Sequence, residues 1–180
     1  MTDRKLLNIE LGRITADAYR TTRPSSGIVL VLDNIRSAHN VGSAFRTADA
    51  FGVDRIYLGG ICPVPPSAEL HKVALGAEEV VPFEHVSDVV ALVGRLRSDG
   101  YTVVAVEQTV HSVKLDELPA PAVTEKIALI FGNEVDGVQQ EVVDAADFSL
   151  EIPQHGTKHS LNVSVSIGVV LWAIQEFPWR

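Results

Sequence analysis

Apolar residues along this chain fall into short runs and into longer stretches with helical spacing. Residues 28–32 form a run rich in β-branched side chains, which predicts a buried strand. The polar turn after it leads to apolar residues at helical spacing, which predict a helix that Ser37 or Asn40 can cap. The same reading predicts strands at 55–58, 79–83, 102–106, 126–131 and 148–152, and helices at 5–19, 69–76, 86–97, 138–145 and 160–177.

Strands alternate with helices over the whole length, and the chain has no internal repeat. This order predicts an α/β fold in which a mostly parallel sheet carries helices on both faces. We expect one domain over residues 1–180, with residues 1–23 as a helical extension in front of the sheet. The polar, proline-containing segment 107–123 is expected to be a long loop on the side of the active site.

The last predicted helix is apolar on nearly every side and contains Trp172 and Ile174. A helix of this kind has to bury its whole circumference. It therefore lies either in the middle of the molecule or with one face against a second subunit.

Gly42 falls in the first turn of the helix that follows the first strand. A glycine there costs up to about 1 kcal/mol relative to alanine, so it indicates that another backbone or a ligand comes close.

The glycine patterns of common nucleotide sites are absent. The first strand is followed by Asp33-Asn-Ile-Arg36 rather than Gly-x-Gly-x-x-Gly, and no Gly-Lys-Ser/Thr occurs. A Rossmann-type cofactor site and a P-loop are therefore disfavoured.

The formal net charge of -8 argues against a protein that simply coats nucleic acid, because such binding depends on neutralising phosphates. A local basic patch is compatible with this charge, since Asp33 is the only acid within a stretch that holds four arginines. Those candidates for RNA binding are Arg20, Arg23, Arg36 and Arg46. Scattered, solvated arginines are the alternative interpretation.

Hydrophobic residues make up 46% of the 180 residues, which is enough for one sizeable core. No run resembles a signal peptide or reaches the length of a membrane span, so we expect a cytoplasmic protein that does not bind membranes. The single cysteine, Cys62, allows no internal disulfide and offers no zinc cluster. We interpret it as a packing or surface thiol.

Three segments carry motifs in order along the chain. The first is Asn40-x-Gly42-x-x-x-Arg46, and the second is Ile127-Ala-Leu-Ile-Phe-Gly-Asn-Glu-Val-Asp-Gly137. The third is Leu150-Glu-Ile-Pro-Gln-His-Gly-Thr-Lys-His-Ser-Leu-Asn-Val-Ser164. Together they resemble the motifs of the SpoU (TrmH-like) RNA 2'-O-ribose methyltransferases of the SPOUT superfamily, and the resemblance runs from Gly27 to the C-terminus.

The resemblance implies a SPOUT-type fold with a C-terminal trefoil knot, a homodimer, and S-adenosylmethionine as the cofactor for methylation of a ribose 2'-hydroxyl in tRNA or rRNA. Methyl transfer from a sulfonium needs no metal, so we expect none. The family's cofactor positions match Thr109, Gly132, Ile152 and Leu161. Gly132 leaves room for an adenosine, and Ile152 and Leu161 can form apolar walls. An ordinary place in the core is the alternative for these two apolar residues.

The motifs also imply catalytic or substrate-positioning roles for Arg46, Asn40, Glu134, Ser160 and Asn162. Family accounts give the arginine a role in activating the ribose hydroxyl. A guanidinium normally stays protonated, however, so clamping a phosphate and orienting the hydroxyl are physically easier roles. In the alternative interpretation, Arg46 pairs with Asp49 or Glu134 on the surface, Glu134 is an acid at a helix start, and Ser160 and Asn162 cap the last helix.

Two other functions stay open at this point: a non-catalytic RNA-binding or assembly protein on the same knotted dimer, and a base-methylating enzyme. His155, Lys158 and His159 crowd the third motif, where they either contact RNA phosphates or form a solvated turn. Two histidines without acids at ligand spacing make a poor metal site.

Overall fold

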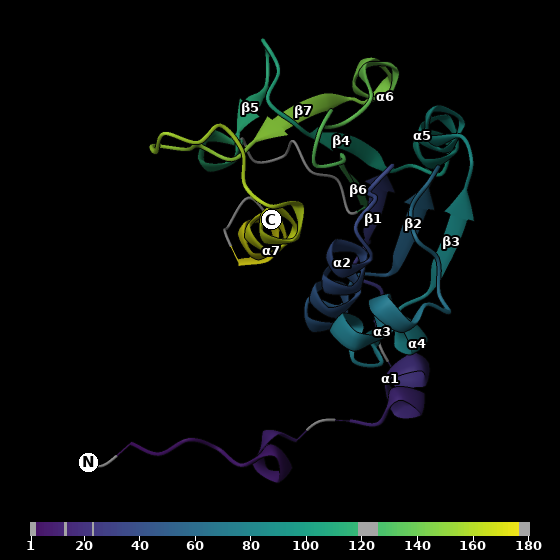
Figure 1. The fold of residues 1–180 in the computed structure, drawn as a ribbon, viewed down its shortest axis with the longest axis vertical. Helices are drawn as coiled ribbons and strands as arrows, with labels where there is room; N and C mark the ends of the chain where they lie inside the picture. Colours follow the sequence, from purple (N-terminus) through teal and green to yellow (C-terminus); the bar gives the residue numbers. More distant parts are fainter. Residues whose placement is uncertain (1–2, 13, 23, 119–125, 177–180) are drawn as a thin grey trace.

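A computed structural model of the 180-residue chain describes residues 3–12, 14–22, 24–118 and 126–176. Its strands form one sheet in the order β3-β2-β1-β6-β4-β7-β5, and every neighbouring pair among these described strands is parallel (Figure 1). The strands are β1 (Ile28–Asp33), β2 (Arg55–Gly59), β3 (Phe83–Val86), β4 (Thr102–Val106), β5 (Val113–Lys114), β6 (Ile127–Phe131) and β7 (Phe148–Glu151). The predicted parallel α/β architecture is confirmed.

Helices cover both faces of this sheet (Figure 1). They are α1 (Ala16–Thr22), α2 (Ala38–Ala50), α3 (Ala68–Ala74), α4 (Ala77–Val80), α5 (Val89–Ser98), α6 (Gln140–Ala145) and α7 (Val163–Glu176), with short 3-10 helices η1 (Asn8–Leu11) and η2 (Leu115–Glu117). Alternate residues of β1 point to opposite faces. Leu30 and Leu32 therefore join a core with α2, α3 and α7, while Val29 and Val31 join a second core with α5 and α6.

The helix predicted over residues 5–19 is wrong in its bounds. Gly12 adopts a left-handed φ of 60° and ends η1, and α1 begins only at Ala16. The strand predicted over 79–83 is also wrong, because Gly76 at φ 93° starts the short helix α4 there. The strand begins at Phe83, which the parallel register places opposite Ile56 of β2.

Segment 107–123 is less irregular than predicted as far as residue 118; residues 119–123 lie outside the described residues. It contains η2 and the two-residue strand β5, whose Val113 pairs with Leu150 of β7. A strand of two residues has too few positions to show a period-2 pattern, so the sequence could not reveal it.

The last helix begins at Val163 rather than at residue 160, and it does not bury its whole circumference within one chain. Ile167, Val170 and Leu171 are buried in the core. Val165, Val169 and Trp172 lie one helical turn apart on the other side and are 50%, 38% and 56% exposed. The sequence allowed two positions for this helix, in the middle of the molecule or against a second subunit. The first is excluded, because one side of the helix is not buried within the single chain. The structure describes no helix with the length and apolar character that a bilayer crossing requires.

Candidate active site

A cavity of about 500 Å³ opens at the carboxyl ends of β4, β6 and β7. Residues 106–108 after β4, residues 131–137 after β6 and several residues between 150 and 166 line it. The chain builds outward from β1 to β2 and β3 and then returns to β4 on the other side of β6. Ligands in open α/β sheets bind outside the carboxyl strand ends where the strand order reverses in this way. The cavity is therefore placed where this class of fold binds its ligands.

A tight turn after β6 forms one wall of the cavity. Asn133 and Gly137 exchange two backbone hydrogen bonds of 3.1 Å across it, and the Asn133 side-chain oxygen accepts from the amides of Val135 and Asp136. A Cβ on Gly132 would lie 1.9 Å from the Gly137 carbonyl carbon and 2.0 Å from the Val138 nitrogen. Gly132 lines the cavity as expected, but its missing side chain is required first by the protein's own backbone.

Glu107 and Gln108 join this turn to the other two cavity segments, and sequence analysis did not single them out. One Glu107 carboxylate oxygen accepts from the Val138 amide at 3.0 Å, and the other accepts from the Gln108 amide at 2.8 Å. The Gln108 side chain donates to the His159 carbonyl at 2.8 Å. The signal that could have found them is an acid and an amide directly after a buried strand at the carboxyl edge.

Asn40, Glu134 and Asn162, one residue from each motif, form a hydrogen-bonded chain. Asn40 Nδ2 donates to Glu134 Oε1, and Asn162 Nδ2 donates to Asn40 Oδ1 at 3.2 Å. Ser37 rather than Asn40 caps α2, since its Oγ accepts from the Asn40 amide. Asn162 also caps α7, because its Oδ1 accepts from the Ser164 amide at 2.9 Å. The capping interpretation of Asn162 is therefore confirmed, and its role in the site stays a prediction.

Arg46 stands apart from this chain. It is exposed on α2, and among the described residues its side chain has no ion pair or hydrogen bond. The alternative pairing with Glu134 is not present, since Glu134 bonds to Asn40. Six residues separate Arg46 from Asn40, which corresponds to a rise of about 9 Å and places the two side chains on different sides of the helix.

The remaining predicted residues divide between the cavity and other places. Ile152, Leu161 and Ser160 line the cavity; Leu161 is 41% exposed and so is not a core residue. Thr109 lies just beyond the lining residues, where its carbonyl accepts from the Ser112 hydroxyl. Arg36 is exposed in the loop after β1. The side chain of Arg20 and all of Arg23 lie outside the described residues.

Gly42 faces α3, as the sequence suggested for a close approach. A Cβ there would lie 2.7 Å from the Leu70 carbonyl oxygen. Asp33 is a third residue that the sequence did not single out. It is fully buried at the end of β1, and its carboxylate accepts from the Gln139 amide at 2.8 Å and from the Gln139 side chain at 2.6 Å. Asp33 thereby fixes the start of α6 just after the cavity turn.

A family model described as the SpoU rRNA methylase family matches residues 27–172, and this range includes all three motifs and the whole cavity. The chain belongs to the SpoU family. It is 35% identical over 145 residues to the 23S rRNA (guanosine-2'-O-)-methyltransferase RlmB of Nitrosomonas europaea, a match that covers 81% of this chain and 54% of that protein. The chain spans about half the length of the curated relatives it matches.

Solved SpoU-family structures agree with the fold. The TrmH/SpoU tRNA modifying enzyme of A. aeolicus superposes with a TM-score of 0.76 at 28% identity, over 88% of this chain and 79% of that one. An AdoMet-bound rRNA methyltransferase from Sinorhizobium meliloti gives a TM-score of 0.75 at 29% identity, over 86% of this chain and 58% of that one. The SPOUT-type α/β fold implied by the motifs is therefore confirmed.

Cys62 lies in the core and is not among the residues that line the cavity. Its thiol is buried and donates to the Leu32 carbonyl at 3.2 Å. Burial raises the pKa of this thiol to about 12, so the reactive thiolate is scarce at neutral pH. The interpretation as a packing residue is confirmed.

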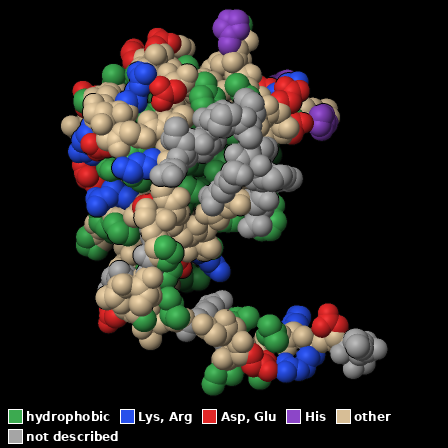
Figure 2. All heavy atoms as spheres, turned by 180° about the vertical axis from the view of Figure 1, so that it is seen from behind, with side chains coloured by type: hydrophobic (Ala, Val, Ile, Leu, Met, Phe, Trp, Pro, Cys, Tyr) green, Lys and Arg blue, Asp and Glu red, His purple; other side chains and the backbone are tan. Residues whose placement is uncertain are grey.

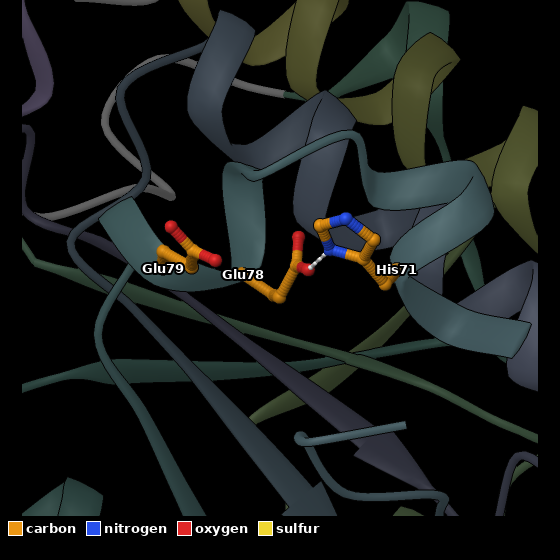
Figure 3. A group of neighbouring side chains, drawn as sticks. All are labelled: His71, Glu78 and Glu79. Carbon is orange, nitrogen blue, oxygen red and sulfur yellow. Dashed lines mark hydrogen bonds and ion pairs between the residues drawn. The ribbon is translucent and has the colours of Figure 1, made fainter. Parts of the chain in front are cut away.

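His71, Glu78 and Glu79 form a separate cluster on α3 and α4, helices that contribute no residue to the cavity lining (Figure 3). His71 Nδ1 bonds to Glu78, whose second oxygen accepts from the Gly76 amide at 3.1 Å. The hydrogen bond to Glu78 raises the pKa of His71 above its ordinary value. Glu78 thus already has two partners, and we interpret the pair as a connection between the two short helices.

Proposed function

We propose that this SpoU-family chain transfers a methyl group from S-adenosylmethionine to a ribose 2'-hydroxyl in tRNA or rRNA. The observation that carries the proposal is the hydrogen-bonded chain Asn40–Glu134–Asn162, which unites the three motifs beside the cavity. The names of the matched proteins support the reaction, since they include a 23S rRNA guanosine-2'-O-methyltransferase and a tRNA modifying enzyme.

The cavity has the size and chemistry that the cofactor requires. Its volume of about 500 Å³ lies within the usual range for small-molecule sites. Ile152, Leu161 and Phe131 supply apolar surface for a planar base. Four carboxylates line it, and the described lining contains no lysine or arginine; the acids are Glu107, Glu134, Asp136 and Glu151. Bound S-adenosylmethionine supplies a methyl group on a positively charged sulfur, and a negative wall favours such a cation.

Each motif residue has a role that suits its geometry. Asn40 fixes the orientation of the Glu134 carboxylate, and Asn162 fixes the orientation of Asn40. Ser160 lies at the rim, where its hydroxyl can position the substrate. We assign to Arg46 the clamping of an RNA phosphate and the orientation of the ribose hydroxyl, because a guanidinium offers a planar fork of hydrogen-bond donors and no acceptor. Thr109, next to Gln108, contributes backbone groups at the edge of the cofactor site.

Arg36 and Arg46 are the described part of the proposed RNA surface, and Arg20 and Arg23 complete it in this proposal. Both described arginines are exposed, and they lie on the segment that follows β1 at the carboxyl edge of the sheet. RNA phosphates would therefore meet positive charge beside a negatively lined cofactor cavity.

We infer that two copies associate through α7. The exposed stripe Val165, Val169 and Trp172 is apolar, and a C2 contact is the commonest way to cover such a face. Arg46 also points to a different side of α2 from Asn40, which suits a site completed by a second copy. The proposal includes one domain over residues 1–180 with its 1–23 extension, the C-terminal trefoil knot, chemistry without a metal, and a cytoplasmic location where RNA and cofactor are present.

The deciding experiment supplies the protein with methyl-labelled S-adenosylmethionine and unmodified tRNA or rRNA. A methylated 2'-oxygen cannot attack its neighbouring phosphate, so the label should appear in alkali-resistant dinucleotides. Label in alkali-sensitive mononucleotides would mean base methylation. Retention of RNA binding without any transfer to either RNA class would favour the non-catalytic alternative.

A further inference from the structure

The loop between β7 and α7, residues 153–161, has no helix or strand of its own. Its residues from His155 to Leu161 are all exposed, and the loop projects beyond the end of β7 (Figure 1). Histidine side chains stand at the outline of the molecule seen from behind (Figure 2), and His155 and His159 of this loop are both exposed. Burial of side chains therefore contributes little to the conformation of the β7–α7 loop.

The same loop forms one side of the cavity. The loop residues that line the cavity are Gln154, His159, Ser160 and Leu161. A ligand bound in such a cavity leaves quickly when the loop can move and slowly when the loop is held. The contact that holds the loop therefore affects how long a ligand stays bound.

Gln108, the second residue after β4, makes that contact. Its side-chain Nε2 donates to the His159 carbonyl at 2.8 Å, although the two residues lie 51 positions apart. Among the residues that the structure describes, no other hydrogen bond joins the β7–α7 loop to a residue outside it. The bond therefore tethers the loop, close to its C-terminal end, to the segment that follows β4.

Glu107 holds the backbone of Gln108 in place for this bond. One carboxylate oxygen of Glu107 accepts from the Gln108 amide, and the other accepts from the Val138 amide after the cavity turn. Hydrogen bonds from Val138 through Glu107 and Gln108 to His159 thus join the three cavity segments. The side chain of Gln108 is exposed, so replacing it should leave the core unchanged.

We propose that Gln108 is a positioning residue that holds the β7–α7 loop against bound S-adenosylmethionine; this inference rests on the proposed function. Gln108 acts through the loop and takes no part in methyl transfer itself. Without the bond to the His159 carbonyl, the loop moves away more often and the cofactor leaves the cavity faster. Gln108 therefore sets the release rate of the cofactor and has little effect on the chemical step.

The charge of the cavity distinguishes a tether from a general electrostatic effect. Four carboxylates line the cavity, and Gln108→Glu would add a fifth. Attraction between charges predicts that this variant binds the positively charged S-adenosylmethionine more tightly. A tether predicts weaker binding, because an ionised carboxylate has no hydrogen to donate to the His159 carbonyl oxygen.

Calorimetry and stopped-flow release measurements on the full chain test the tether. Gln108→Met keeps the length of the side chain without its donor and should raise the dissociation constant of S-adenosylmethionine about three- to tenfold, through faster release. Gln108→Glu should weaken binding by about tenfold. S-adenosylhomocysteine, which lacks the positive charge on sulfur, should lose affinity for Gln108→Met by the same factor. Methyl transfer by Gln108→Met should show a higher KM for the cofactor, with kcat within about twofold of the parent's.

Gln140→Met is the matched control. Gln140 is also exposed, and its side chain donates to Asp144 on its own helix at 2.7 Å, away from the cavity lining. This variant should bind and release S-adenosylmethionine as the parent does. Trypsin reports on the loop directly, since cleavage after the exposed Lys158 should be about threefold faster in Gln108→Met than in Gln140→Met. Thermal unfolding checks that both variants are folded.

The outcomes separate failure of the tether from failure of the proposed function. If the parent chain does not bind S-adenosylmethionine, the proposed cofactor fails and the tether fails with it. If the parent binds the cofactor but Gln108→Met releases it at the parent's rate, only the tether is overturned. Tighter binding of S-adenosylmethionine by Gln108→Glu, with unchanged affinity for S-adenosylhomocysteine, would overturn the tether and assign Gln108 to the charge of the cavity.

Discussion

Polar side chains connect loops in two parts of the molecule, and the two parts differ in how far apart the connected residues lie in the sequence. Around the cavity, Asn40 bonds to residues 94 and 122 positions away, and Asp33 bonds to one 106 positions away. Around α3 and α4, His71 bonds to Glu78 seven positions away, and Glu78 bonds to Gly76 two positions away.

The sequence separation of two bonded residues determines how much of the fold must form before their contact can form. A bond between near neighbours closes a short loop and needs little of the remaining fold. A bond across more than 90 residues forms only when the sheet has placed both partners. Small changes in the cavity turns should therefore have large effects on cofactor binding and stability. Changes in the His71–Glu78 pair should have small, local effects on stability.

The largest expected effect comes from Gly132→Ala. The new Cβ would overlap the Gly137–Val138 backbone, and because no flexible side chain is available to move, the turn itself must shift. We expect loss of S-adenosylmethionine binding by calorimetry and a decrease in the free energy of unfolding of about 1–3 kcal/mol. Gly156→Ala is the matched control, since a Cβ there meets nothing within 4 Å. Unchanged cofactor affinity in a folded Gly132→Ala variant would remove this turn from the cofactor site.

Arg46→Ala should reduce methyl transfer without changing the fold or the cofactor affinity. Because Arg46 is exposed and its side chain makes no hydrogen bond or ion pair within the described part of the chain, the variant should fold normally and bind S-adenosylmethionine as the parent does. Methyl transfer should decrease by about 100-fold or more, the scale seen when a positioned donor is removed. Arg46→Lys keeps the charge but loses the planar fork, so it should also be strongly impaired if the guanidinium clamps a phosphate at two points. Full transfer activity in Arg46→Ala would falsify the assigned role.

Glu107→Gln should weaken the cofactor site without removing it. A glutamine offers one acceptor oxygen where two backbone amides, those of Val138 and Gln108, now bond to the carboxylate. One amide loses its partner at a cost of about 1–3 kcal/mol. We expect the dissociation constant of S-adenosylmethionine to rise about tenfold, with a smaller change in kcat. The exposed Glu141→Gln on α6 provides the control, and equal affinities for the two variants would exclude a positioning role for Glu107.

The smallest expected effect belongs to His71→Gln, and it depends on pH. Glu78 raises the pKa of His71 above 6.5, so the protonated pair stabilises the folded state below that pH, and this contribution disappears as pH rises through the folded-state pKa. Urea unfolding should show the parent more stable than the variant at about pH 6 and indistinguishable from it at about pH 9. His111→Gln, at an exposed histidine, should show no such difference. A gap that widens towards pH 9 would contradict the ion pair.

The same contrast explains what the sequence could predict. Strands such as β1 and β6 follow from continuous apolar runs, and α2 follows from apolar residues at helical spacing. The segment 79–83 was predicted wrongly because Val80, Val81 and Phe83 are typical of a strand, whereas the left-handed turn at Gly76 decides the local structure. The start of β3 at Phe83 depends in addition on its pairing with Ile56 of β2, about which a local pattern contains no information.

For the site, the motifs found Asn40, Glu134 and Asn162, and the structure brings them together. Glu107 was missed because both of its partners are backbone amides, which have no signature in the sequence. Asp33 was missed because Gln139, which bonds to it through its backbone and its side chain, lies 106 positions away. Their position directly after a buried strand was the only available signal. The exposure of Arg46 on a different side of α2 was predictable from helical geometry alone.

The central place of β1 in the sheet has a consequence for how the chain is made. β1 pairs on one side with β2, which follows soon after, but its other edge pairs with β6, which joins Ile28 to Ile127. Contacts of such high sequence separation slow folding, and β1 leaves the ribosome long before β6. Until β6 is made, one edge of β1 has no pairing strand, and the Asp33 carboxylate lacks its hydrogen bonds from Gln139. We therefore expect the β1–β3 half to organise first during synthesis, with a period of risk for aggregation that ends only when β6 inserts.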